Sequence, residues 1–323
     1  MKNIHCELCP NHCLLEEGQM GICGGRIGRE GKCVEYRHGS LAAIHIDPIE
    51  KKPLYHFYPG SEALSLGGWG CNLKCRGCQN DSLSRVCANK VNAQVYDAQR
   101  IVLLAQNEKC CSIAYTYNEP IIWWEYMDEV AILARNQGIK NVMVTAGYVS
   151  PEARERVFAH IDAANVDLKG FSEDFYRSWA HGRLDTILET LEFLHDKRDF
   201  WLEVTTLLIP GINDDEKMLR AEFEWFVEHL GTQVPLHLSA FHPAAEAMDI
   251  PATSLETVIK AGNLALEAGI EYVYLGNVPV KNDTKCPKCG QTLIGRFGYR
   301  TDCIGIKDGF CRTCGQRVPG VFV

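Results

Sequence analysis

Two kinds of apolar segment alternate along the chain after residue 60. Short runs rich in β-branched and aromatic residues are typical of buried strands, and the longer stretches between them have the three-to-four-residue spacing of amphipathic helices. Strands are predicted over Leu64–Gly68, Ser112–Tyr117, Asn141–Ala146, Asn165–Lys169, Phe200–Ile209, Pro235–Phe241 and Glu271–Leu275. Helices are predicted over Asp97–Gln106, Ile121–Gln137, Pro151–Ile161, Leu184–Asp196, Asp214–His229 and Ser254–Ala268. Repeated βα units imply an α/β fold with a parallel sheet and right-handed crossovers.

The segment before these units has a different pattern. Apolar residues alternate with polar ones between residues 32 and 46, which predicts short strands. Three prolines between Asp47 and Ser61 then favour an ordered loop over a helix or a central strand. Farther along, Asn213 or Asp214 is expected to cap the helix that follows the Ile-Pro-Gly turn.

Length and composition limit the class of protein. With 323 residues, of which 46% are hydrophobic, the chain can bury a large core. No apolar run reaches the roughly 18 residues of a membrane span, and the first residues lack the apolar core of a secretory signal. We therefore expect a cytoplasmic protein with no membrane partner. The 16 cysteines gather in closely spaced groups, which in a reducing compartment indicates metal sites rather than disulfides.

The central group of cysteines lies between glycines, just after a predicted strand. Cys71, Cys75 and Cys78 have the spacing C-x3-C-x2-C. A four-iron cluster is normally held by four thiolates, so three thiolates leave one iron free to bind another molecule. The alternative is a structural zinc knuckle, but zinc closes its shell with four ligands and the next cysteine, Cys87, comes nine residues later. The spacing therefore favours an open [4Fe-4S] cluster.

The N-terminal cysteines provide a complete set of four thiolates. Cys6, Cys9, Cys13 and Cys23 have the spacing C-x2-C-x3-C-x9-C, with glycine turns around the last of them. Four soft ligands can close either a zinc site or an auxiliary iron–sulfur cluster. A structural metal is the simpler interpretation, and both remain open. Possible substitute ligands are His5, His12 and Cys33.

The C-terminal cysteines predict a zinc ribbon. Cys286, Cys289, Cys311 and Cys314 form two C-x2-C knuckles that are 21 residues apart. A segment of this size cannot bury enough core alone, so metal binding would contribute much of its folding energy. Residues 281–323 also carry a net charge of +5 in a chain whose total is −8, so this tail could hold an acidic partner, an RNA or the body itself. The remaining thiols are interpreted as core or surface residues: Cys33, Cys87, Cys110, Cys111 and Cys303.

Polar residues lie along or just after several predicted strands, and folds built from βα units bind ligands at strand ends. Asp167 and Lys169 are two positions apart in one strand, so they face the same way. The other candidate ligand contacts are Asn118, Glu119, Glu203, Thr205, His237, His242 and Asn277. Simpler roles compete, because Glu119 also suits a helix start and a histidine is most often a buried, hydrogen-bonded core residue.

The three-cysteine loop resembles the signature of radical S-adenosylmethionine (radical SAM) enzymes. Together with the segment from Asp47 to Ser61 and Gln79-Asn80 after the third cysteine, it resembles the radical SAM member of the AmmeMemoRadiSam system, which is related to pyruvate formate-lyase activating enzymes. The resemblance implies a partial, open (β/α)6 barrel over residues 61–280, an N-terminal metal-binding segment over 1–60 and the ribbon over 281–323. One position departs from the family: Gly77 stands where an aromatic residue commonly shields the cluster and contacts adenine.

The resemblance also implies a reaction. An external one-electron reductant would reduce the cluster held by Cys71, Cys75 and Cys78, and SAM would be cleaved to methionine and a 5′-deoxyadenosyl radical that removes hydrogen from a substrate. No further catalytic side chain is assigned. A glycyl-radical protein or another macromolecule is the implied substrate, with Memo-like and AMMECR-like partners. An RNA or small-molecule substrate, and a non-catalytic metal scaffold or electron carrier, remain the alternatives.

Overall fold

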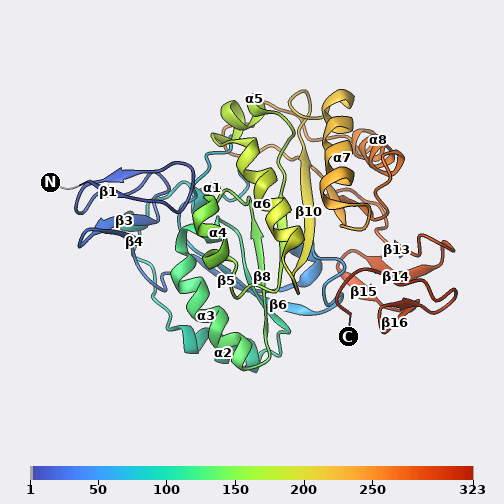
Figure 1. Cartoon of the computed structure of the whole chain (residues 1–323), viewed down its shortest axis with the longest axis horizontal. Helices are drawn as coiled ribbons and strands as arrows, with labels where there is room; N and C mark the ends of the chain where they lie inside the picture. Colours follow the sequence, from blue (N-terminus) through green and yellow to red (C-terminus); the bar gives the residue numbers. More distant parts are fainter. Residues whose placement is uncertain (1–2, 323) are drawn as a thin grey trace.

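The computed structural model describes residues 3–322, and an eight-stranded sheet forms its centre (Figure 1). The strands are β5 (Ala43–Pro48), β6 (Glu62–Gly67), β7 (Ser112–Tyr115), β8 (Lys140–Thr145), β9 (Ala163–Asp167), β10 (Trp201–Leu208), β11 (Leu236–Ala240) and β12 (Val273–Gly276). Their spatial order follows the chain, with β6 to β12 parallel and β5 antiparallel to β6. Within the described residues β5 and β12 do not pair with each other, so the sheet remains open.

Helices cover the outer face of this sheet. They are α2 (Ala98–Asn107), α3 (Trp124–Asn136), α4 (Pro151–Val157), α6 (Leu184–Asp196), α7 (Glu216–Leu230) and α8 (Leu255–Glu267). Shorter helical turns are η1 (Ile49–Lys51), α1 (Asp81–Ser84), η2 (Ala88–Lys90), η3 (Pro120–Trp123), α5 (Glu173–Phe175) and the π-helix η4 (Tyr176–Ala180). Every strand and helix predicted after residue 60 is present, with ends displaced by a few residues. Across residues 3–322, no helix combines the length and the apolarity that crossing a membrane requires.

The predicted cap of α7 was wrong. Asp215 caps this helix by accepting a hydrogen bond from the Met218 N–H, whereas Asp214 accepts one from Gly211. Asn213 instead joins two strand ends: its amide accepts from the Ile209 N–H and donates to the carbonyls of Lys169 and Leu207. The buried backbone groups beyond β9 and β10 need partners, and this need takes precedence over capping.

The loop between β5 and β6 closes one end of the barrel-like sheet. Leu54 and Phe57 are buried against the first residues of four parallel strands. The Glu203 carboxylate accepts hydrogen bonds from the backbone N–H groups of Tyr55 and His56, and the Asn165 amide donates to Pro53. The predicted ordered loop is therefore present, with η1 inside it, and it plugs the end where the strands begin.

Two small cysteine-rich modules lie at opposite ends of the long axis (Figure 1). The N-terminal module contains the hairpins β1 (Ile4–His5) with β2 (Leu14–Leu15) and β3 (Arg26–Arg29) with β4 (Lys32–Glu35). The C-terminal ribbon contains β13 (Thr284–Lys285), β14 (Thr292–Phe297), β15 (Arg300–Asp302), β16 (Ile306–Lys307) and β17 (Phe310–Cys311). The ribbon shares a small core with Tyr272 and Tyr274 of the β12 region.

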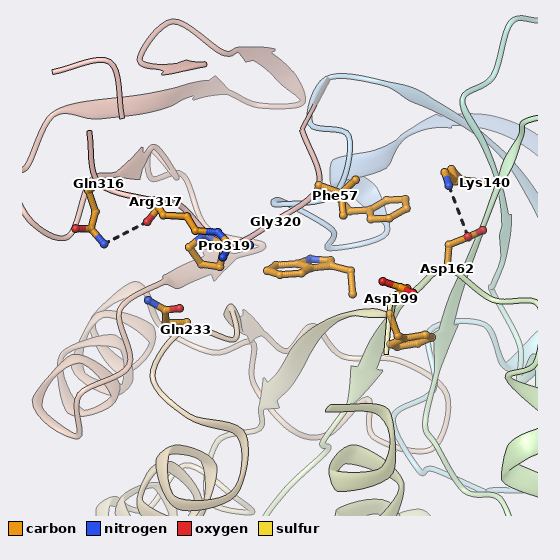
Figure 2. Close-up of a pocket in the computed structure, with 12 residues that line it drawn as sticks. Phe57, Lys140, Asp162, Asp199, Gln233, Gln316, Arg317, Pro319 and Gly320 are labelled. Atoms are coloured by element: carbon orange, nitrogen blue, oxygen red, sulfur yellow. Dashed lines mark hydrogen bonds and ion pairs between the residues drawn. The ribbon is translucent and has the colours of Figure 1, made fainter. Parts of the chain in front are cut away.

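A cavity of about 680 Å³ lies where the ribbon's tail meets the strand starts (Figure 2). Phe57, Lys140 and Asp162 line one side, and Arg317 with Pro319 lines the other. Lys140 opens β8 and Asp162 precedes β9, so this cavity belongs to the plugged end of the sheet. It is therefore remote from the strand ends at which ligands bind in βα folds.

His56 in the plug loop makes folding sensitive to acid. Its imidazole is fully buried, with Nδ1 2.7 Å from the Pro319 carbonyl oxygen and Nε2 2.6 Å from the Tyr274 hydroxyl. A carbonyl can only accept, so Nδ1 carries the proton and Nε2 accepts from Tyr274. Burial lowers the pKa of His56 to about 4.

Stability should therefore fall as the pH drops from 6.5, the usual histidine pKa, towards 4, because the unfolded chain then binds a proton that the folded chain excludes. Between pH 7.5 and pH 5 we expect the free energy of unfolding to lose about 2 kcal/mol through this residue. Urea titration followed by tryptophan fluorescence measures it. His56→Asn retains a donor near Pro319 but cannot be protonated, so it should be less stable at pH 7.5 and less sensitive to acid. An equal pH dependence in the variant would contradict this account.

Candidate active site

The three-cysteine loop follows β6 at the open end of the sheet and is held by residues that follow β7. The Asn118 side chain accepts a hydrogen bond from the Gly68 N–H at 2.8 Å and donates to the Gly70 carbonyl at 2.9 Å. Asn80, just after the third cysteine, donates to the Tyr117 carbonyl at 2.8 Å. Both ends of the loop are therefore fixed to the end of β7, as expected if Asn118 belongs to the site.

The other side of the loop pairs with the segment between β9 and α6. The N–H groups of Lys74 and Arg76 donate to the carbonyls of Ala180 and Trp179, at 2.8 and 3.1 Å. Trp179 and Ala180 end the π-helix η4, and π-helical turns are often found at functional sites. A wide helical turn leaves these carbonyls directed outward, where they can accept from the loop.

The thiols of Cys71, Cys75 and Cys78 are half-buried. Their positions fit binding to different irons of one cluster better than binding to a single metal ion. Within residues 3–322, the group of cysteines whose sulfur atoms all lie within 4.8 Å of one another is at the C-terminus, and these three are outside it. Thiolates that bind different irons of a cluster must stand apart. Burial raises the pKa of the Cys71 and Cys75 thiols, so their ionised forms need positive charge nearby. The donor set therefore fits a [4Fe-4S] cluster.

Glu119 braces the end of β8 next to this loop. Its Oε1 accepts from the Thr145 hydroxyl at 2.6 Å and the Ile121 N–H at 3.3 Å, and its Oε2 accepts from the Ala146 N–H at 2.9 Å. Burial raises the pKa of Glu119 to about 7, against the opposing effect of the bonds from Thr145 and Ala146. Because each carboxylate oxygen can accept two hydrogen bonds, Oε2 retains one acceptor position.

Asp167 and Lys169 form an ion pair at the end of β9, with Nζ 2.8 Å from Oδ2. The prediction that they face the same way is confirmed. Burial disfavours the ammonium, but Asp167 and then Cys75 outweigh it and raise the pKa of Lys169. The two side chains keep 32% and 24% of their surface exposed, so this charged pair is accessible to a ligand beside Cys75.

Phe241 and Trp179 occupy the space beside Gly77. A Cβ atom at Gly77 would lie 2.8 Å from the Phe241 ring and 3.2 Å from the Trp179 ring. Both rings are buried, and the Arg76 guanidinium lies 5.2 Å from the centre of the Trp179 ring. These rings shield the loop where the family commonly has an aromatic residue. Sequence reasoning missed Trp179 because it lies outside any predicted strand or helix, and Gly77 was the only signal.

The remaining candidates lie elsewhere on the sheet. Glu203 and His237 bond to each other at 2.6 Å near the strand starts, at the plugged end. Thr205 donates to Asn165, and Asn277 donates to the carbonyl of Ala240 at the top of β11. His242 is exposed beyond β11. The structure thus brings Asn118, Glu119, Asp167 and Lys169 to the cysteine loop and leaves Glu203 and His237 at the far end.

An inner cavity of about 320 Å³ lies between the plug loop, strands β10 to β12 and the ribbon. Thr205, His237 and Ser239 line it from the strands, and Asn277 lines it from the end of β12. The ribbon contributes Arg296 and Tyr299 on the side of the β12 edge. The cavity therefore lies at the β12 edge of the sheet, where the ribbon packs.

The C-terminal cysteines form a compact four-thiol site. Cys286 and Cys314 sulfur atoms lie 3.6 Å apart, and those of Cys289 and Cys311 lie 3.7 Å apart. A tetrahedral zinc with bonds of about 2.3 Å places its sulfur ligands about 3.8 Å apart. The geometry fits one ion of this size, in agreement with the predicted knuckles.

The contact between Gly77 and Phe241 can be tested by substitution. Gly77→Ala places a methyl group against a ring that cannot move, so the free energy of unfolding should fall by about 1–3 kcal/mol. Phe241→Leu in the same chain should recover part of that loss by making room. Gly295→Ala is the matched control, because its added Cβ meets no atom nearer than 4.0 Å. Chemical denaturation of Gly77→Ala, Phe241→Leu, the double variant and the control measures the coupling, and strictly additive losses would contradict direct contact.

Known proteins are similar to this chain in sequence and in fold. Residues 68–223 match the family model described as Radical SAM superfamily. An uncharacterised protein of Methanocaldococcus jannaschii is 38% identical over 319 residues, spanning 98% of this chain and 95% of that protein. A second protein of that archaeon, named as a candidate glycyl-radical enzyme activating enzyme, is 23% identical over 240 residues, or 72% of this chain and 86% of that protein. A radical SAM methyltransferase structure from Sphaerobacter thermophilus superposes with a TM-score of 0.52 at 15% identity, covering 68% of this chain and 67% of that one.

The family match begins at the glycines of the cysteine loop and ends in α7, so it includes the strand ends that surround the loop. The structural likeness supports the same α/β fold. From the match, the nearly full-length relative and the three-thiol loop together, the chain belongs to the radical SAM superfamily of enzymes.

Proposed function

We propose that this enzyme binds SAM beside a [4Fe-4S] cluster held by Cys71, Cys75 and Cys78, and cleaves it reductively. Membership of the family implies both cofactors. When bound, the cluster supplies the single electron that splits SAM and the free iron position that receives it. The observation that carries the proposal is the accessible pair Asp167–Lys169 beside the three separated thiols. A permanently charged lysine at this place is a ready partner for a carboxylate.

The chain's own residues would fix the amino acid end of SAM. Lys169 would leave Asp167 in part to pair with the SAM carboxylate, and the remaining acceptor position of Glu119 would take the ammonium. Asn118 would keep the loop, and hence the thiols, in register with these charges. Glu119 lies against the end of β8 and Lys169 follows the neighbouring strand β9. Two opposite charges placed in this way match a zwitterion, which a set of carboxylates alone would not.

For the substrate we infer a protein, modified in the manner of activating enzymes. The support is the relative named for glycyl-radical enzyme activation and the inner cavity between β12 and the ribbon. A cavity of about 320 Å³ has room for a side chain or a short loop rather than a large folded ligand. Tyr299 of the ribbon lines this cavity and is exposed, so it offers an apolar contact to a macromolecule. An external one-electron reductant would be required, and Memo-like and AMMECR-like proteins are the first substrates to examine.

SAM cleavage is the direct test. After anaerobic reconstitution, dithionite and SAM should yield 5′-deoxyadenosine from the wild type, and none from Cys75→Ala. Lys169→Met should raise the KM for SAM roughly 10- to 100-fold, because a charge-assisted hydrogen bond contributes about 1.5–3 kcal/mol.

Lys140→Met is the matched control, because Lys140 is a partly exposed lysine paired with Asp162 at the plugged end of the sheet. It should leave the KM for SAM unchanged. A fully iron-loaded wild type that forms no 5′-deoxyadenosine would refute the proposal, and equal effects of the two lysine substitutions would remove Lys169 from the SAM site.

The proposed protein substrate has its own measurement. A partner protein labelled uniformly with deuterium should transfer deuterium into 5′-deoxyadenosine, because the radical removes a hydrogen atom from the substrate. Mass spectrometry of 5′-deoxyadenosine detects the label. Unlabelled partner is the control for exchange with solvent. Label arriving from a deuterated RNA or metabolite, and none from Memo-like, AMMECR-like or glycyl-radical proteins, would show that the substrate class is different.

A further inference from the structure

The N-terminal module carries a second metal site, and we propose that Cys6, Cys9, Cys13 and Cys23 hold a closed iron–sulfur cluster there rather than zinc. The cluster would lie directly against the three-cysteine loop. We also assign this cluster the role of passing electrons from an external donor to the radical SAM cluster, and that role rests on the proposed function. The metal assignment itself stands on the positions of the cysteines and is tested separately.

The module gathers the four thiols around one interior. The Cys6 N–H donates to the Cys13 carbonyl at 2.9 Å, so these two residues close the β1–β2 hairpin opposite each other. A Cβ atom placed on Gly21 would lie 3.7 Å from the Cys23 sulfur and 3.9 Å from the Cys13 sulfur, so both thiols lie on the same side of this glycine. Cys6, Cys9 and Cys23 are also buried, at 6–7% exposure. Buried cysteines are common as small apolar residues, so the indication of a metal centre comes from having a complete set of four thiols in one small module.

The spacing of these thiols separates a cluster from a zinc ion. The same chain provides both references. The ribbon cysteines lie within 4.8 Å of one another, as ligands of a single ion do, and the three cysteines of the radical SAM loop do not. No three of the N-terminal cysteines meet that limit within residues 3–322. The N-terminal set therefore lacks the compact arrangement of the zinc-type site, as the cluster-binding loop does.

A buried cation lies next to this set. The buried Arg26 side chain donates to both Glu125 oxygens at 2.7 Å and to the Cys33 carbonyl at 3.0 Å. It lies beside the paired thiols of Cys33 and Cys6. Four thiolates around a cluster bring net negative charge into a region of low dielectric constant, where a fixed guanidinium stabilises it. Glu125 and the carbonyl hold the guanidinium in place.

The two cysteine loops touch through their backbones. The Cys71 N–H donates to the Cys23 carbonyl at 3.0 Å, and the Asn11 side chain donates to the Asn72 carbonyl at 2.8 Å. Gly70 has a φ of +84°, and a Cβ atom there would lie 2.2 Å from the Cys23 carbonyl oxygen. No side chain fits between the loops. One ligand of each proposed cluster is therefore joined to the other by a single hydrogen bond.

Because the two loops are in contact, the N-terminal cluster can transfer electrons to the other one. Four protein ligands are compatible with this role. A closed cluster cannot bind SAM, but it can accept one electron and release one. A low-potential one-electron donor protein would be oxidised by one electron, the N-terminal cluster would pass that electron on, and it would return to its starting state with no atom transferred. The module lies at the opposite end of the molecule from the ribbon, so such a donor would not cover the ribbon (Figure 1).

The decisive variant leaves the N-terminal module intact. Cys71→Ala, Cys75→Ala and Cys78→Ala are combined, the protein is reconstituted anaerobically, and iron, sulfide and zinc are counted. We expect about four irons and four sulfides with about one zinc per chain, and an EPR signal after reduction by dithionite. About two zincs without iron, or one zinc alone, would overturn the proposal. The wild type should hold about eight irons.

The converse variant tests the role. Cys9→Ala should retain about four irons, and reduction by a flavodoxin- or ferredoxin-type donor should slow at least tenfold while small-molecule reduction is unaffected. Cys111→Ala, an exposed thiol outside both sites, is the control. An unchanged rate with the donor protein would refute the electron-entry role. A wild type that never cleaves SAM, together with iron in the triple variant, would refute the proposed function and leave this site standing.

Discussion

The hydrogen bonds of one amide hold the active end of this molecule together. Asn118 accepts a hydrogen bond from the Gly68 N–H and donates one to the Gly70 carbonyl. Its position after β7 therefore determines the position of Cys71, the first cysteine of the loop. The loop has glycines at these positions and no side chain that could anchor it to β6. Together with the bonds from Lys74 and Arg76 to the segment after β9, the clamp keeps the three thiols in a fixed place relative to the charged pair at the end of β9. The arrangement of the site follows from this pairing of a loop with its neighbouring strand end.

The two ends of the sheet use polar residues in opposite ways. At the plugged end, the Glu203 carboxylate has donors from Tyr55, His56, Trp201 and His237, which satisfies a buried charge fully. At the other end, Glu119 keeps an acceptor position and Lys169 keeps solvent access. A satisfied network stabilises, and an unsatisfied one is available to a ligand. The difference in hydrogen-bond saturation, more than residue type, distinguishes the structural carboxylate from the candidate functional one.

Periodicity predicted the order of strands and helices because each element buries a continuous apolar face, and it placed Asp167 and Lys169 on one side of β9 correctly. Periodicity could not predict whether a side chain on the inner face lies near the plugged end of the sheet or near the cysteine loop. A period of two says which face a side chain occupies, but Glu203 and Thr205 share a face while only Glu203 contacts the plug loop. Nor could it find Trp179, since a five-residue π-helical turn is too short and too wide to show the 3.6-residue repeat of an α-helix. The cap at Asp215 was missed because the buried ends of β9 and β10 compete for Asn213.

Placing the two cysteine-rich modules at opposite ends follows from the open sheet. β6 starts the parallel series, and its loop has a free side that the N-terminal module covers through backbone contacts at Cys23. β12 ends the series, and its edge is covered by the ribbon through Tyr272 and Tyr274. Each module thus packs at a place where the series of βα units stops providing neighbours. A small module with little core gains most of its stability from bound metal and from such docking. Docking of the two modules at both boundaries therefore compensates for the strand pairs that a closed barrel would have supplied. It leaves the β12 edge next to the inner cavity to be lined by ribbon residues instead of a further strand.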